Sequence, residues 1–244
     1  MSIWDYFLLF SSVLLGGSSI YFFEMKDGKY LKLLLSFSGA YILGITVLHL
    51  MPGVFSSELK YLEYFVLLGF MIQLMVGQLS QGVEHGHVHV HESSAWQLAF
   101  QVMIGLSLHA FMEGLPLSDY AHFHAHHHAD EHNHNHLFWG IIIHKLPAAF
   151  ALGLLLKEAG FSNRIILLLL TVFASMSPLG ALTASFIGDN LTLLSQMVAL
   201  VVGSFLHIST TIIFEADDTK KHQISWPKVL AIVAGLGISM LTTH

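Results

Sequence analysis

The segments Ser107-Leu-His109-Ala-Phe-Met-Glu113-Gly-Leu-Pro-Leu117 and Ile143-His144-Lys145-Leu-Pro147-Ala-Ala149 decide how this chain folds. Stretches without a charged residue, 101–108 and 137–143, precede their histidines. The histidines, the glutamate and the lysine are therefore expected to lie inside hydrophobic helices that cross a membrane. Ionisable groups are costly at that depth, so they indicate a functional site.

The composition is that of a membrane protein. The 244 residues are 54% hydrophobic and 11% charged, with a mean hydropathy of +0.66, whereas soluble domains carry about 25% charged residues. Cysteine is absent, which excludes disulfides and thiolate metal sites, so the available metal ligands are Asp, Glu and the 18 histidines. With a net charge of −6, the chain has no basic surface for nucleic acid.

Eight apolar segments are long enough to cross a bilayer as helices, which takes about 20 residues. They are 4–23, 33–55, 61–81, 95–117, 137–157, 164–187, 191–214 and 226–242. The sequence therefore predicts an all-α fold, a polytopic membrane helical bundle with eight transmembrane helices. The start of the chain lacks a basic n-region, so the first segment is interpreted as a transmembrane helix and not as a removed signal peptide.

The cations between these segments predict the orientation of the bundle. Only Lys60 falls on one side, while eight cations fall on the other: Lys26, Lys29, Lys32, Lys157, Arg164, Lys220, Lys221 and Lys228. Because cytoplasmic loops are enriched in Lys and Arg, the side with eight cations is predicted to be cytoplasmic. Both termini are then expected outside.

Two loops are rich in histidine. The extracytoplasmic loop at about 120–136 contains His122, His124, His126, His127, His128, His132, His134 and His136. The cytoplasmic loop at about 84–92 contains His85, His87, His89 and His91. Such tracts are typical of flexible metal-capturing segments, although a solvated linker or a tag would have a similar composition.

His109 and Glu113 are four residues apart, so on a helix they share one face and can bind the same ion. An uncompensated carboxylate in hydrocarbon costs several kcal/mol, which a divalent cation would offset. A structural polar pair is the alternative.

Lys145, next to His144, has two interpretations: it forms a salt bridge with Glu113, or it takes the place of a second metal ion.

Further polar residues lie within the predicted spans. His49, before a proline near the outer end of the second span, is assigned to gating or metal access, with simple packing as the alternative. Ser177, also before a proline, and His207, in the middle of the seventh span, are candidate pathway residues. A histidine hydrogen-bonded within the bundle is the alternative for His207. Gln73 and Gln78 are polar residues of the third span without an assigned role.

Taken together, these motifs resemble the Zrt/Irt-like (ZIP) metal transporters over nearly the whole chain. The resemblance is carried by His49-Leu-Met-Pro52 in the second span, His109-x-x-x-Glu113-Gly114 in the fourth, His144-Lys145-x-Pro147 with Ala151-Leu-Gly153 in the fifth, and Ser177-Pro-Leu-Gly180 in the sixth. It implies a single ZIP-like transmembrane domain over 1–244.

The resemblance also implies a transport site between the fourth and fifth spans, with His109, Glu113 and His144 as metal ligands. The family's second metal position has lost its ligands, because its usual residues are replaced at three positions: Ala110, Lys145 and Ser177. Ala148 replaces a frequent acid, which leaves the primary site one protein ligand short. In these respects the chain resembles a single-metal branch of the family.

The expected function is import of a divalent metal ion into the cytoplasm. Zinc is the expected substrate, with Fe²⁺, Mn²⁺ and Cd²⁺ as further candidates, and no organic cofactor is expected. The resemblance implies an elevator-like slide of spans one, four, five and six against the other four, a homodimer, and a place in the plasma (inner) membrane. The alternatives are a membrane-embedded zinc-dependent hydrolase, for which the His-Glu-x-x-His motif is absent, and a His-rich metal sensor or storage protein; an enzyme is not expected.

Overall fold

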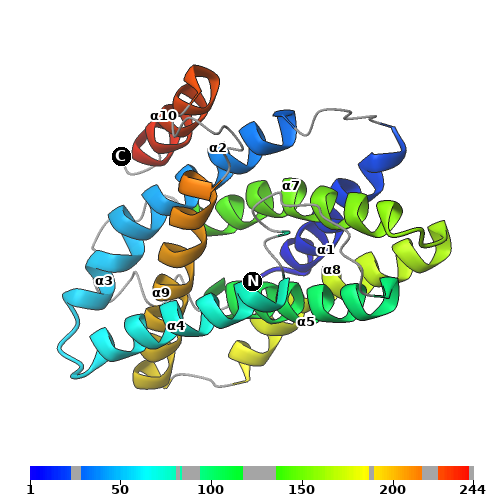
Figure 1. The fold of residues 1–244 in the computed structure, drawn as a ribbon. Coiled ribbons are helices and arrows are strands. Elements are labelled where there is room, and N and C mark those ends of the chain that lie inside the picture. Colours follow the sequence, from blue (N-terminus) through cyan, green and yellow to red (C-terminus); the bar gives the residue numbers. More distant parts are fainter. Residues whose placement is uncertain are drawn as a thin grey trace.

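The computed structural model describes residues 1–22, 29–80, 83, 94–117, 136–186, 190–215 and 225–241. Every regular element in these ranges is a helix, which confirms the predicted all-α fold (Figure 1). The long helices are α1 (Ile3–Ser18), α2 (Lys29–Ile45), α4 (Leu62–Ser80), α5 (Ala95–Gly114), α7 (His136–Glu158), α8 (Asn163–Ser185), α9 (Leu191–Glu215) and α10 (Trp226–Leu241). The short ones are η1 (Ser19–Tyr21), η2 (Thr46–Leu50), α3 (Met51–Phe55) and η4 (Leu115–Leu117).

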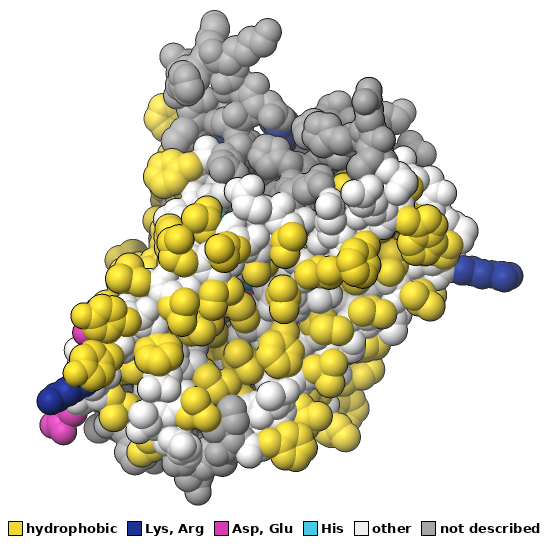
Figure 2. Space-filling model, turned by 60° about the horizontal axis from the view of Figure 1, so that its bottom comes forward, with side chains coloured by type: hydrophobic (Ala, Val, Ile, Leu, Met, Phe, Trp, Pro, Cys, Tyr) yellow, Lys and Arg dark blue, Asp and Glu magenta, His cyan; other side chains and the backbone are white. Residues whose placement is uncertain are grey.

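These helices match the predicted spans. Seven helical segments in the described part of the chain are long and apolar enough to cross a membrane, and the eighth predicted span is the shorter apolar helix α10. Large hydrophobic side chains are exposed along the bundle, for example Phe7, Leu67 and Leu168. Figure 2 shows a face on which hydrophobic side chains spread across the molecule and charged ones lie at its margins. The chain is therefore an integral, multi-pass membrane protein.

The helices pack as two groups. The first helix group consists of α1, α5, α7 and α8, in which α1 packs on α7 and on α8, and α5 packs on α8. The second helix group consists of α2, α4, α9 and α10, in which α4 lies along α9 and α2 contacts α9 and α10. The two groups meet where α7 contacts α2 and where α5 contacts α4. In Figure 1, α7 crosses the bundle, and it is the most buried of the long described helices.

The second predicted span is one helical stretch of 27 residues with a π-helical turn inside it. The N–H of Met51 bonds to the carbonyl of Thr46, five residues earlier, at the end of η2. Pro52 follows at once and has no N–H to donate, so the regular α-helical pattern cannot continue unchanged here. The π-turn carries His49, and such turns are frequent at functional sites.

A tight turn connects α7 to α8 within the first helix group. Gly160 has a φ of +82°, a conformation that glycine adopts without strain. Its N–H bonds to the carbonyl of Lys157, and the N–H of Phe161 bonds to the carbonyl of Leu156. This pair of bonds is a Schellman motif, which terminates α7 and turns the chain directly into α8.

A close crossing holds α5 on α8. A Cβ atom at Gly114 would collide with the carbonyl oxygen of Ser177, and one at Gly180 would collide with that of Phe111. Small residues let helix backbones approach in this way. The Ser177 hydroxyl adds a hydrogen bond of 2.7 Å to the carbonyl of Ala110. The crossing therefore fixes the part of α5 that carries His109 and Glu113.

The crossing predicts opposite effects of the same substitution at two helical glycines. Gly180→Ala should lower the melting temperature, because the new methyl group meets backbone that cannot move aside, and overpacking costs about 1–3 kcal/mol. Gly237→Ala in α10 is the matched control, because nothing lies within 4 Å of its added Cβ, and Ala is favoured over Gly in a helix by roughly 0.5–1 kcal/mol. Thermal unfolding of the purified variants measures the difference, and equal melting temperatures would show that the α5–α8 crossing is not tight.

Candidate metal centre

Four ionisable side chains meet between α5 and α7. His109 and Glu113 lie one turn apart on α5, and His144 and Lys145 are consecutive on α7. Each side chain belongs to a residue that is at most 3% exposed. Burial of this kind is unusual for Glu and Lys unless they are paired, so their contacts explain why they are tolerated in the bundle.

Two histidine nitrogens point at one oxygen of Glu113. His109 Nε2 lies 2.9 Å and His144 Nε2 lies 3.9 Å from Glu113 Oε1. The three atoms all lie within 4.8 Å of one another. The two imidazole rings are nearly perpendicular, at 89°, with centroids 6.1 Å apart. These three residues form the one group of three or more His, Asp or Glu side chains with metal-binding geometry in the described ranges.

The outer nitrogen of each ring contacts the second helix group. Gln73 Oε1, on α4, lies 3.1 Å from His109 Nδ1 and accepts a 2.8 Å hydrogen bond from the Ser204 hydroxyl on α9. Ser38 Oγ, on α2, lies 3.5 Å from His144 Nδ1 and donates to the carbonyl of Leu35. Since Gln73 Oε1 can only accept, the hydrogen of the neutral His109 ring is on Nδ1 and the lone pair is on Nε2.

The inward-facing atoms of these side chains lie close to one another. His109 Nε2, Glu113 Oε1 and His144 Nε2 form no hydrogen bond with any described residue, although their separations are short. Buried polar atoms are almost always partnered, and an unpartnered one costs about 1–3 kcal/mol. Converging lone pairs of this kind can be satisfied together by one cation, and imidazole nitrogen with carboxylate oxygen suits Zn²⁺.

Lys145 binds the other oxygen of the same carboxylate. Its Nζ lies 2.7 Å from Glu113 Oε2 and 5.6 Å from the centroid of the Phe173 ring on α8. The salt bridge with Glu113, one of the two interpretations drawn from the sequence, is present, while the interpretation that Lys145 takes the place of a second metal ion stays a prediction. The carboxylate is thus divided between the histidine pair and a fixed positive charge.

The other candidate residues do not join this group. His49, on the π-turn, stacks on His136 at the start of α7, with ring centroids 5.6 Å apart and planes at 26°. His207 packs edge-on against Phe70, with centroids 4.9 Å apart. The Ser177 hydroxyl binds the backbone of α5. Apart from His136, the loop histidines at 122–134 and 85–91 lie outside the described residues.

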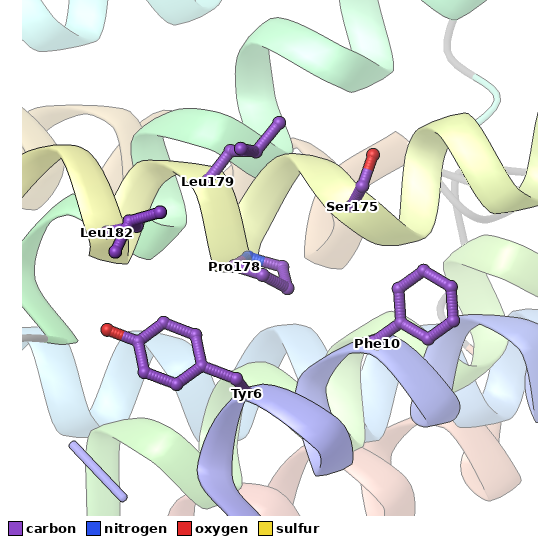
Figure 3. Close-up of a pocket in the computed structure, with 6 residues that line it drawn as sticks. All are labelled: Tyr6, Phe10, Ser175, Pro178, Leu179 and Leu182. Carbon is purple, nitrogen blue, oxygen red and sulfur yellow. The ribbon is translucent and has the colours of Figure 1, made fainter. Parts of the chain in front are cut away.

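An apolar groove of about 330 Å³ lies elsewhere, between α1 and α8 (Figure 3). Tyr6 and Phe10 line it from α1, and Pro178, Leu179 and Leu182 line it from α8. The hydroxyl of Ser175, also in its wall, is bonded to the carbonyl of Val172. The groove contains no histidine or acid, so its chemistry is not that of a metal site.

The sequence alone did not identify the residues around the candidate ligands. Gln73 was visible as a buried amide in an apolar span, but nothing indicated that it meets His109. Ser38, Ser204 and Phe173 gave no signal, because serines and aromatic residues are common in such helices. Only the packing of α2, α4, α8 and α9 around α5 and α7 brings them to the site.

Comparisons with known proteins agree with this architecture. A family model described as ZIP zinc transporter matches residues 78–243. The protein zntC of Dictyostelium discoideum is 28% identical over 154 residues, which are 59% of this chain and 35% of that protein. The chain thus spans about a third of the length of the curated relative it matches. Because the family model covers more than half of the sequence, the resemblance predicted from the motifs is confirmed, and the chain belongs to the ZIP zinc transporter family.

Proposed function

We propose that this protein transports a divalent metal ion, with zinc as its principal substrate, through a site made of His109, Glu113 and His144. The observation that carries the proposal is the convergence of three buried ligand atoms without a hydrogen-bond partner in the described residues. Membership in a metal-transporter family supports the same function. Two imidazoles and one carboxylate leave coordination positions open for water, as exchangeable zinc sites do, while Fe²⁺, Mn²⁺ and Cd²⁺ remain candidate substrates.

The site is proposed to hold one ion at a time. An ammonium about 5 Å from a dication repels it by several kcal/mol at an effective dielectric of 20, and Glu113 offsets part of this repulsion. Lys145 Nζ contacts Glu113 Oε2, which would otherwise be free to bind a second ion. One weakly bound metal suits a carrier that must release its substrate. The chain is thus proposed to belong to the single-metal branch of the family.

Movement is proposed as a slide of the first helix group against the second. The ligands belong to α5 and α7, and both helices lie where the two groups meet. A site at such a junction can face opposite sides of the membrane in turn. The excess of Lys and Arg in the loops on one side of the bundle supports assigning that side to the cytoplasm. Both termini then lie outside, and the metal ion is imported from the outside. We further propose that the chain forms a single domain, assembles as a homodimer and resides in the plasma membrane.

Metal access is proposed to run past the histidine-rich loop that precedes α7. The last histidine of that loop, His136, stacks on His49. His136 is eight residues before His144 on one helix, a rise of about 12 Å at 1.5 Å per residue. His49 and His136 therefore lie on the side of the bundle from which an ion captured by the loop would approach.

The site ligands can be tested by substitution. His109→Ala and Glu113→Ala should nearly abolish uptake of Zn²⁺ into proteoliposomes, because each removes one of three protein ligands. Ser209→Ala is the control, since this buried serine on α9 bonds to the backbone of its own helix, and its uptake should stay near that of the unaltered protein. Wild-type uptake in either ligand variant would remove the site from α5. Zinc binding without any uptake by the unaltered protein would favour a sensor, a storage protein or a hydrolase.

Lys145→Met should separate the effect of the charge on the metal from its effect on the fold. Without the ammonium, Glu113 can give both oxygens to an ion, so zinc should bind more tightly and leave more slowly. Without metal, Glu113 loses its 2.7 Å partner, and breaking a buried ion pair costs about 3–5 kcal/mol, so the metal-free melting temperature should fall. Calorimetry measures the zinc affinity, and melting curves with and without Zn²⁺ measure the stability. Unchanged or weaker zinc binding together with a lower melting temperature would assign Lys145 a purely structural role.

The histidine-rich loop should matter only when metal is scarce. Replacing its seven histidines at 122–134 by serine, with His136 left in place, should raise the zinc concentration for half-maximal uptake and leave the maximal rate unchanged, because these imidazoles concentrate ions near the path without lining it. Replacing the four histidines at 85–91 provides the comparison on the other side of the membrane. A lower maximal rate at saturating zinc would place the outer loop in the transport path itself.

A further inference from the structure

We propose that Gln73, held by Ser204, is the positioning residue for the metal ligand His109, and that this contact makes metal affinity depend on how the two helix groups are docked. The proposal rests on the function proposed above and concerns the same site. Gln73 and Ser204 are 0% and 1% exposed, so both side chains are enclosed in the bundle. Neither contributes a ligand atom to the His109, Glu113 and His144 group.

The geometry gives Gln73 Oε1 two donors. The Ser204 hydroxyl donates to it from α9 at 2.8 Å, and His109 Nδ1 donates to it from α5 at 3.1 Å. With the hydroxyl as donor, the same amide oxygen is shared between Ser204 and the imidazole. The oxygen in turn requires a hydrogen on Nδ1, so in the neutral ring Nε2 carries the lone pair, and it faces Glu113 Oε1 at 2.9 Å.

The contact therefore selects both the tautomer and the direction of the ring. Ligating histidines usually donate their other N–H to such an acceptor, and removing the acceptor typically costs 10–100-fold in metal affinity. The alternative use of Gln73, as a helix–helix bridge without a role at the site, would not need the oxygen to face a metal ligand. Its Nε2 has no hydrogen-bond partner among the described residues, so the hydrogen bonds that this amide makes with them all go through its oxygen.

This bond crosses from one helix group to the other. His109 belongs to the first helix group, whereas Gln73 and Ser204 belong to the second. The corresponding contact of His144 with Ser38 also crosses between the groups, but at 3.5 Å it is longer and weaker. A slide of one group past the other would separate His109 from its acceptor, free the ring to turn, and weaken the metal site. Binding would thus be strongest in the docked arrangement and release easier after the slide.

Affinity measurements on purified protein test the positioning role. Gln73→Leu should weaken Zn²⁺ binding about 10- to 100-fold, and Ser204→Ala should weaken it less, because Gln73 remains but is held less firmly. Gln73→Glu keeps an acceptor oxygen and should bind at least as tightly as the unaltered protein. Ser209→Ala is the matched control, since this buried serine on α9 bonds only to the backbone of its own helix. The d–d spectrum of bound Co²⁺ should change in Gln73→Leu and stay unchanged in Ser209→Ala.

A double-mutant cycle separates this proposal from the proposed function. In a His109→Ala background, Gln73→Leu should have no further effect on zinc affinity, because the ring it positions is gone. Equal affinities of Gln73→Leu and the unaltered protein would overturn the positioning role while leaving the site intact. An equal loss from Gln73→Leu with and without His109 would also overturn it, since Gln73 would then act through the fold. Full zinc affinity in His109→Ala alone would overturn the proposed site itself.

Discussion

The carboxylate of Glu113 is the group on which the site depends, because its two oxygens face two different partners. Oε2 binds the Lys145 ammonium at 2.7 Å, and Oε1 faces the Nε2 atoms of His109 and His144. An unpaired carboxylate would not be tolerated in this buried place. The lysine compensates its charge when no metal is bound, while the second oxygen remains available. A single anionic side chain can in this way remain buried with and without metal.

The rest of the bundle positions that carboxylate between α5 and α7, and these two helices must keep their relative position for its contacts to persist. The α5–α8 crossing, with glycines against backbone carbonyls and Ser177 bonded to Ala110, fixes the position of Glu113. Lys145 comes from α7, which is ordered relative to α8 by the short turn at Gly160. The acceptors of the two imidazoles come instead from α2 and α4. The candidate ligands and the residues that contact their rings thus belong to different helix groups, so the proposed metal binding would depend on the relative position of those groups.

The sequence allowed the candidate ligands to be predicted, but not the residues that contact their rings. His109 and Glu113 were recognisable from their four-residue spacing in an apolar segment, and His144 and Lys145 because charge is rare there. The all-α fold and the family were predicted from the same motifs and are confirmed. Gln73, Ser38 and Ser204 depend on the rotation of α2, α4 and α9 about their axes. Uniformly apolar helices in a bilayer have only a weak hydrophobic stripe to indicate that rotation, so sequence periodicity could not specify it. The roles predicted for the loop histidines and the orientation remain predictions, since most of the loops lie outside the described residues.

X-ray absorption at the zinc edge, on protein loaded with zinc after the histidines of 122–134 and 85–91 are replaced by serine, tests the central claim most directly. The division of Glu113 between one metal and one ammonium predicts one zinc per chain. That ion should have two imidazole nitrogens and oxygen ligands at about 2.0–2.2 Å. A zinc–zinc distance of about 3.5–4 Å, as in paired metal sites, or an ion without imidazole ligands would contradict it.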